Sequence, residues 1–310
     1  MSARFAAAAA KHVLRHSHTG PAQSMNPDLQ HFDYTTVGHV TIDVLEDGSR
    51  RAGGAAFYSA LQAARLGWRT LIITRGVVRE IEEALEPYRH ELALKVLPAQ
   101  HTTTLATFGS GSARTQRVLA WAGPIAEDLA LDTSLLHLAP VARESPSEWR
   151  GAVDFLGLTP QGLVRQWSTP GAAIELAAPS AGAVSLAGRC DAIVVSEHER
   201  AACSAMIAAA SAAGAVVAVT AGARPTTLLA PGGASVELHV PEIVDPVDDL
   251  GAGDVFAAAL FIELAAGRTA PEAAAFANAA AAMRVDGKGA GAIGKRTEIE
   301  ARLAHSRPTA

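Results

Sequence analysis

The sequence is poor in charged side chains, in aromatic rings and in cysteine. Charged residues make up 18% of the 310 positions, and aromatic residues only 5%. The 26 Lys and Arg do not outnumber the 31 Asp and Glu, so there is no basic excess to neutralise nucleic-acid phosphates. No apolar run is long enough to span a bilayer. We therefore expect neither a nucleic-acid partner nor a membrane partner.

Hydrophobic residues, in contrast, account for 49% of the chain, which excludes a highly charged disordered protein. The length fits one large α/β domain or two ordinary ones. The only cysteines are Cys190 and Cys203, too few for a disulfide framework. This composition predicts two core thiols and a cytoplasmic protein.

The N-terminal segment differs from the rest of the chain. Residues 1–27 contain no Asp or Glu, and alanine fills most of residues 5–10. We expect residues 1–30 to form a disordered extension, although the basic, Ala-rich composition also loosely fits a transit peptide. Met25 is an alternative start of translation. The folded domain is then expected over residues 31–305.

Strand-like and helix-like segments alternate along most of this domain. Apolar runs typical of buried parallel strands lie at 37–43, 70–74, 135–139, 153–158, 192–195 and 215–220. Helical patterns lie at 53–66, 77–86, 197–213, 255–266 and 271–286. Strands separated by helices predict an α/β fold with a mostly parallel central sheet and helices on both faces. The β-rich stretch 91–121, joined by residues 44–52, predicts a small appended sheet.

The segment with the clearest chemistry is 248–256, Asp-Asp-Leu-Gly-Ala-Gly-Asp-Val-Phe. The small residues Gly251, Ala252 and Gly253 let backbone N–H groups approach an anion at the start of a helix. A carboxylate at Asp254 would repel that anion, unless it is a general base that takes the proton from an attacking hydroxyl. The simpler alternative is an Asp that only caps a helix after a glycine turn.

This segment resembles the C-terminal signature of the PfkB (ribokinase-like) family of carbohydrate and nucleoside kinases. The matching positions are Asp248, Gly251, Ala252, Gly253, Asp254 and Phe256. Gly53-Gly54, followed by Arg-Leu-Gly at 65–67, resembles the family's N-terminal signature. Residues 136–142 and 157–165 look like the branch of inositol-kinase-like and uncharacterised sugar kinases. The resemblance implies a ribokinase-like fold with a small β lid from about 44–52 and 91–121.

The resemblance also implies an activity, which is ATP-dependent transfer of the γ-phosphate to a hydroxyl of a small sugar or polyol. Asp254 would be the general base, the turn 251–253 would be the anion hole, and Mg²⁺ would assist. The residues expected at the acceptor are Asp43, Gly53, Gly54, Tyr58 and Arg165. The residues expected at the nucleotide are Ser196, Glu199, Thr220, Gly222 and Asn278. The residues expected at the metal are Glu199 and Asp248. A monovalent cation and a homodimer through the lid are left open.

The chain departs from the family pattern at several positions. Tyr58 stands where a sugar-contacting Asn is usual, and Ser196 stands where the family has the Asn of an Asn-x-x-Glu motif. Asp249 and Leu250 replace the residues that follow the first Asp of the signature. The aromatic pair at 57–58 favours a nucleoside acceptor as an alternative, and a non-catalytic sugar or nucleotide sensor also stays open. Both proposed roles have a simpler alternative. Arg165 could be an ordinary surface arginine, and Glu199 could be an acidic residue in the first turn of a helix.

Overall fold

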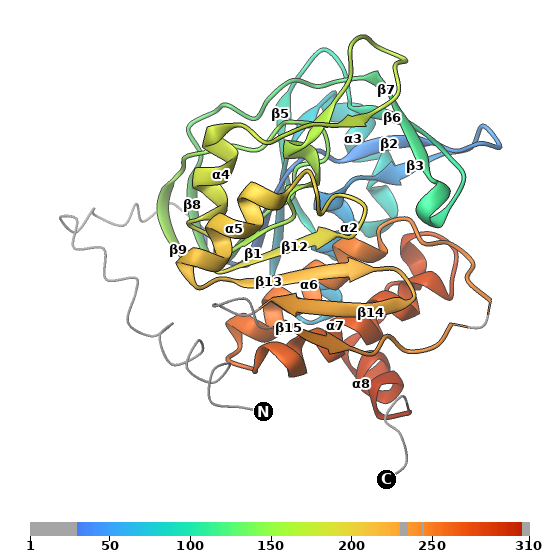
Figure 1. Ribbon diagram of the computed structural model, residues 1–310. Helices are drawn as coiled ribbons and strands as arrows, with labels where there is room; N and C mark the ends of the chain where they lie inside the picture. The colour runs from blue at the N-terminus through green and yellow to red at the C-terminus, as the bar shows by residue number, and fades with distance from the viewer. Residues whose placement is uncertain (1–29, 230–234, 244, 306–310) are drawn as a thin grey trace.

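The computed structural model describes residues 30–229, 235–243 and 245–305. The expected N-terminal extension lies outside the described residues, apart from residue 30. A nine-stranded sheet forms the centre of the molecule (Figure 1). Its strands stand in the order β15 (Ser235–Leu238), β14 (Arg224–Leu229), β13 (Val216–Ala221), β12 (Ala192–Ser196), β9 (Arg150–Leu158), β8 (Ala130–Leu138), β1 (Phe32–Val37), β4 (Thr70–Gly76) and β5 (Ala93–Pro98). All neighbours from β13 to β5 are parallel, while β14 and β15 are antiparallel.

Helices cover both faces of this sheet, because successive side chains of a strand point to opposite sides. In β12, Ala192 and Val194 join a core with α2 (Ala55–Arg65), α6 (Ala252–Ala265) and α7 (Ala270–Val285). Ile193 and Val195 join the opposite core with α4 (Ala181–Ala187) and α5 (Ser204–Ala213). The other helices are α3 (Val78–Ala84), α8 (Arg296–His305) and the 3-10 turns η1 (Glu86–Tyr88), η2 (Gly111–Ala113), η3 (Pro160–Leu163) and η4 (Ala290–Ala292). The expected α/β architecture is confirmed.

A second, four-stranded sheet has the order β3 (Arg50–Gly53), β2 (Thr41–Val44), β6 (Thr104–Phe108) and β7 (Thr115–Ala120). Leu105 and Val118 from this small sheet pack against Val141 and Ala142, which follow the carboxyl end of β8. A short antiparallel pair, β10 (Arg165–Gln166) and β11 (Glu175–Leu176), completes the strands. The small sheet therefore lies over the carboxyl ends of the central strands, where α/β folds place their sites.

The structure divides the stretch 37–43, which we expected to be one strand. A Cβ on Gly38 would lie 2.2 Å from the carbonyl oxygen of Ala139, so the backbones meet closely there. Next, the N–H of Val40 donates to Thr74 Oγ1 at 2.8 Å, which bonds the chain where it leaves the central sheet. The expected strand is therefore split into the end of β1 and the start of β2. Asp43 lies in the small sheet and not at the end of the first central strand.

Two other segments also differ from the sequence-based expectation. Strand β5 falls within the stretch 91–121, yet it pairs in parallel with β4 at the edge of the central sheet. Only β6 and β7 of that stretch lie in the small sheet, together with β3 from 44–52. The expected helix 197–213 begins only at Ser204, because residues 197–203 form turns.

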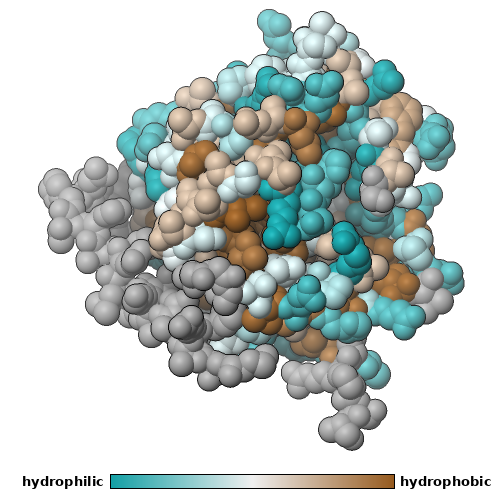
Figure 2. Space-filling view, viewed as in Figure 1, coloured by the Kyte–Doolittle hydropathy of each residue, from teal (hydrophilic) through white to brown (hydrophobic). Residues whose placement is uncertain are grey.

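Three features of the structure can be compared with the composition: the hydrophobicity of the helices, the polarity of the surface and the burial of the two cysteines. No helix of the described residues is long and apolar enough to cross a membrane. Figure 2 shows hydrophilic and apolar residues interspersed over one face of the molecule. Cys190 and Cys203 are both buried, as expected of core thiols.

Candidate active site

Asp254 lies in the first turn of α6, beneath the small sheet. Burial raises the pKa of its carboxyl group to about 7, and the nearby charge of Arg165 opposes that rise. The carboxylates of Glu199 and Asp43 raise the pKa further. These charges come from β10, from the turn after β12 and from β2, so the fold gathers residues from distant parts of the chain around Asp254. At neutral pH this carboxyl group can both accept and release a proton.

The turn before Asp254 has the geometry of an anion site. Helix α6 begins after Gly251, whose φ of 85° is in the left-handed region that favours glycine. A Cβ there would lie 2.4 Å from the ring of Tyr58. The N–H groups of Gly253 and Asp254 have no acceptor within the helix itself, whereas the N–H of Ala252 donates to the carbonyl oxygen of Asp249 at 3.3 Å. Those amides and the helix dipole favour a negative charge at this end of α6.

Tyr58 does not present its ring to an acceptor as expected from its position in the sequence. Its exposed fraction is 1%, and the ring packs directly beneath Gly251. The guanidinium carbon of Arg284 lies 5.4 Å from the centre of the ring, on α7. Tyr58 therefore supports the glycine turn from below, and its neighbour Phe57 is equally buried.

Asp43 is a second carboxylate beneath the small sheet, and it is buried. Its Oδ1 accepts a hydrogen bond from Thr41 Oγ1 at 2.7 Å, and burial raises the pKa of the carboxyl group to about 6. A Cβ on Gly53 would lie 2.1 Å from Asp43 Oδ2, so only glycine fits opposite this side chain. The following Gly54 has a φ of 93°, and its Cβ would lie 2.3 Å from the carbonyl oxygen of His39. At both positions of the pair, a side chain larger than that of glycine would therefore clash with a neighbouring group.

Arg165 reaches toward these carboxylates from β10. Its Nη1 donates to the carbonyl oxygen of Val141 at 3.1 Å, and its Nη2 donates to Gln116 Oε1 at 2.9 Å. Burial lowers the pKa of its guanidinium, while the charges of Glu199 and Asp254 act in the opposite direction. Within the described part of the chain this guanidinium has hydrogen bonds but no ion pair. Arg165 is half-buried, so the alternative interpretation as an ordinary surface arginine does not fit its position.

The residues expected at the nucleotide lie at the ends of β12 and β13 and on α7. Ser196 Oγ donates to Glu199 Oε2 at 2.6 Å. The two turns meet where the N–H of Glu197 donates to the carbonyl oxygen of Thr220 at 2.7 Å, and the exposed Gly222 follows. Among them Ser196, Thr220 and Gly222 are at least partly exposed, whereas Glu199 is 6% exposed.

Asn278 is buried on α7 and has protein partners for both ends of its amide. Its Oδ1 accepts from Thr226 Oγ1 at 2.8 Å, and its Nδ2 donates to the carbonyl oxygen of His239 at 3.0 Å. These bonds join α7 to β14 and to the segment after β15. Asn278 therefore shapes this edge of the fold, and its amide is already hydrogen-bonded.

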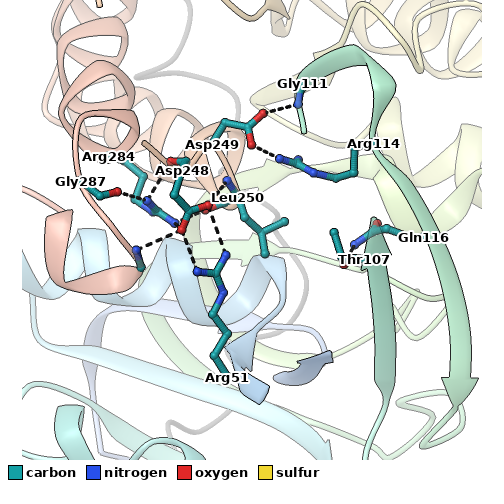
Figure 3. Close-up of polar contacts among 11 residues, drawn as sticks. Arg51, Thr107, Gly111, Arg114, Gln116, Asp248, Asp249, Leu250, Arg284 and Gly287 are labelled. Atoms are coloured by element: carbon teal, nitrogen blue, oxygen red, sulfur yellow. Dashed lines mark hydrogen bonds and ion pairs between the residues drawn. The ribbon is translucent and has the colours of Figure 1, made fainter. Parts of the chain in front are cut away.

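Asp248 does not fit a role as a metal ligand, because both of its oxygens are taken by donors from the protein. Its Oδ2 accepts from Arg51 Nη1 at 2.7 Å and from Arg284 Nη2 at 2.9 Å (Figure 3). The N–H of Gly289 donates to Oδ2 at 3.0 Å, and the N–H of Leu250 donates to Oδ1 at 3.0 Å. These partners hold the pKa of Asp248 well below its usual range. The described residues contain no group of three or more acidic, His or Cys side chains placed to hold a metal.

Asp249 faces the small sheet. One oxygen accepts from Arg114, which immediately precedes β7, and the other accepts from the N–H of Gly111 at 2.8 Å (Figure 3). Our sequence reasoning missed Arg51, Arg114 and Arg284. Arg284 had a detectable signal, a single arginine in an alanine-rich helix, whereas the other two looked like ordinary strand residues.

Comparisons with known proteins bear on the family pattern and on the fold. Residues 177–297 match the family model described as pfkB family carbohydrate kinase. A search of curated protein sequences found no match. Among solved structures, a pyrophosphate-dependent kinase in the ribokinase family is 18% identical, with a TM-score of 0.67 over 87% of this chain and 99% of that one.

Two further structures come from named organisms. A nucleoside kinase from Burkholderia thailandensis, in complex with inosine, is 16% identical, with a TM-score of 0.70 over 88% of this chain and 97% of that one. Ribokinase from Arabidopsis thaliana, with ribose and ATP, is 18% identical, with a TM-score of 0.66 over 88% of this chain and 99% of that one. At such identities the likeness concerns the fold. Residues 177–297 thus carry the sequence pattern of the pfkB family of carbohydrate kinases, and the chain as described has the fold of ribokinase-family kinases.

Proposed function

We propose that the protein is an ATP-dependent kinase that phosphorylates a hydroxyl of a small sugar or polyol. The observation that carries this proposal is the position of Asp254. A carboxyl group with a pKa of about 7 lies in the first turn of α6, where the N–H groups of Gly253 and Asp254 have no acceptor within the helix. A general base beside an anion hole is what in-line phosphoryl transfer to a hydroxyl requires.

In the proposed reaction the acceptor hydroxyl gives its proton to Asp254 as its oxygen attacks the γ-phosphorus. The new O–P bond forms while the bond to the β-phosphate oxygen breaks, and ADP leaves. The backbone N–H groups of Gly251, Ala252 and Gly253 stabilise the negative charge that develops on the phosphoryl oxygens. Asp43 positions the acceptor by accepting hydrogen bonds from its hydroxyls.

Arg165 and the nucleotide side complete the proposed site. The guanidinium of Arg165, which has no ion pair among the described residues, is suited to hold a phosphoryl oxygen, because it presents several N–H donors in one plane. The donor nucleotide would lie along Ser196, Thr220 and Gly222, with Asn278 shaping the far wall. Mg²⁺, bound through Glu199 and water, would neutralise charge on the phosphates.

In the proposed site, the small sheet would shield the reaction from water. An enzyme that transfers a phosphoryl group must exclude water, since water would otherwise be the acceptor. We propose that the small sheet is the lid of the site, as its position over the first turn of α6 supports. The lid is also a candidate surface for a homodimer, which a measurement of mass in solution would test.

The nucleoside alternative loses its main support from the sequence. Phe57 and Tyr58 are each 1% exposed, so neither ring offers a stacking surface to a base. A panel of acceptors nevertheless has to include nucleosides, because the similar structure from Burkholderia thailandensis binds inosine. Pyrophosphate belongs in the panel of donors, because another similar structure is a pyrophosphate-dependent kinase.

The test is release of ADP from ATP by the purified full chain with inositols, ribose and cytidine as acceptors. We expect turnover with a sugar or polyol, and a loss of about 10²-fold or more in kcat for Asp254→Asn with nucleotide binding retained. Asp154→Asn, an exposed aspartate on β9, is the matched control and should keep full activity. Binding of a sugar or nucleotide in a calorimeter without any product, for every donor and acceptor, would instead indicate a sensor.

A further inference from the structure

The guanidinium of Arg284 fills a cage of oxygen atoms beside the anion turn. Arg284 lies near the end of α7 with an exposed fraction of 0%. Its Nη1 donates to the carbonyl oxygens of Asp248 at 3.0 Å and Gly287 at 3.1 Å. Its Nη2 donates to Asp248 Oδ2 at 2.9 Å and to the carbonyl oxygen of Leu250 at 2.6 Å. Figure 3 shows these partners converging on the one side chain from both sides.

Backbone carbonyls together with one carboxylate are the kind of oxygen set that binds a hard cation. In this chain every one of those oxygens already accepts a hydrogen bond from Arg284. The charge also disfavours an additional ion, because the single carboxylate of Asp248 faces two guanidinium groups, those of Arg284 and Arg51. The cage therefore does not fit the monovalent cation that the family resemblance left open.

The caged guanidinium is connected to the turn that precedes Asp254. It holds the carbonyl oxygen of Leu250, the residue directly before Gly251. It also lies over the ring of Tyr58, 5.4 Å from the ring centre, and that ring supports Gly251 from below. Arg284 thus fixes the start of α6 through a hydrogen bond and through an aromatic ring.

We propose that Arg284 is a built-in cation that orders the anion turn, so that the protein needs no potassium or sodium ion at this place. Arg284 is a positioning residue, since it acts on the amides of the turn through Leu250 and Tyr58 and touches no reacting atom. The proposal rests on the proposed kinase function for its activity measurement only. Its stability measurement is independent of that function.

The first experiment uses the unmodified protein. Its melting temperature and its rate of ADP release are measured in potassium chloride and in tetramethylammonium chloride of equal ionic strength. We expect both quantities to be unchanged between the two salts. A saturable rise of either quantity with potassium ion would overturn the proposal.

The second experiment removes the charge with Arg284→Met, beside the conservative Arg284→Lys and the control Arg79→Met on the exposed face of α3. In tetramethylammonium chloride we expect Arg284→Met to lower kcat/KM by about 10²-fold, mainly through kcat, because the anion turn is displaced. Potassium chloride should restore part of that activity and raise the melting temperature of Arg284→Met, with little effect on the control.

Arg284→Lys keeps a positive charge at the cage and should retain more activity than Arg284→Met. If Arg284→Met does not fold, Arg284→Lys and the unmodified protein in the two salts still decide the question. Equal activity and stability of Arg284→Met and the unmodified protein without potassium would overturn the proposal. If no acceptor gives ADP at all, the kinase function fails, while the melting curves still test Arg284.

Discussion

Arg114 and Asp249 form an ion pair that joins the small sheet to the loop in front of α6. Arg114 precedes β7, one edge of that sheet, and Arg51 on the opposite edge strand β3 pairs with the neighbouring Asp248. Adjacent carboxylates thus hold both edges of the small sheet over the anion turn. Any movement of the sheet as a lid has to break or carry these contacts.

The first prediction concerns this pair. Arg114→Gln and Asp249→Asn should each raise the KM for the acceptor more than they change kcat, because the lid then closes less firmly. The double variant should be little worse than either single variant, with a coupling energy of about 0.5–3 kcal/mol in a double-mutant cycle. Arg117→Gln, on β7 with its side chain exposed, is the control. Strictly additive effects on KM would show that the ion pair does not hold the small sheet in place.

The second prediction concerns the dependence of activity on pH. Asp254 must be ionised to accept a proton, and its pKa is raised to about 7. Activity should therefore increase as the pH rises through about 7 and level off above it. Arg165→Met removes the main charge that lowers this pKa, so the rising limb should move to higher pH, which a pH profile of kcat/KM would measure. A limb near the ordinary value for aspartate, about 4, would contradict the assignment.

The third prediction concerns stability. Because the folded state holds the proton of Asp254 up to about pH 7 and the unfolded chain releases it near pH 4, stability decreases with rising pH between those values. Asp254→Asn removes this penalty. Its melting temperature should exceed that of the unmodified protein at pH 8, and the difference should shrink as the pH falls toward 4. If Asp254→Asn melts at the same temperature as the unmodified protein at pH 8, the ionised carboxylate does not destabilise the folded state.

The fourth prediction compares the two glycines of the anion turn. Gly251→Ala should destabilise the protein by about 1–2 kcal/mol or more, because its left-handed backbone disfavours a side chain and the new Cβ would meet the Tyr58 ring. Gly253→Ala is the matched control, since no atom lies within 4 Å of its Cβ position and φ is not positive. It should gain up to about 1 kcal/mol from the helix preference of alanine. Equal unfolding free energies in urea would refute this distinction.

Local sequence patterns were sufficient for the fold class and for the two glycine turns. The apolar runs predicted the five central strands β4, β8, β9, β12 and β13 within a few residues, because burial on both faces imposes its own composition. The pair Gly53-Gly54 and the turn 251–254 were also predictable. At Gly53, Gly54 and Gly251 the backbone is so close to another group that a side chain does not fit, and glycines in such motifs stand out in a single sequence.

The tertiary structure alone decided the partners of the charged residues. Arg51 and Asp248 are separated by 197 positions, and Arg284 is separated from Asp248 by 36, so no local pattern connects them. The expected metal role of Asp248 does not fit these contacts, since its partners come from β3 and α7.

The hydrophobic pattern also could not predict that the strand breaks after β1, because the contact between Gly38 and Ala139 forms only when β8 is in place. The sequence by itself determined which residues can be buried and which turns need glycine, since those are properties of each segment. Which charge meets which, and hence that Tyr58 and Arg284 support the anion turn, depended on packing between segments that are far apart in the chain.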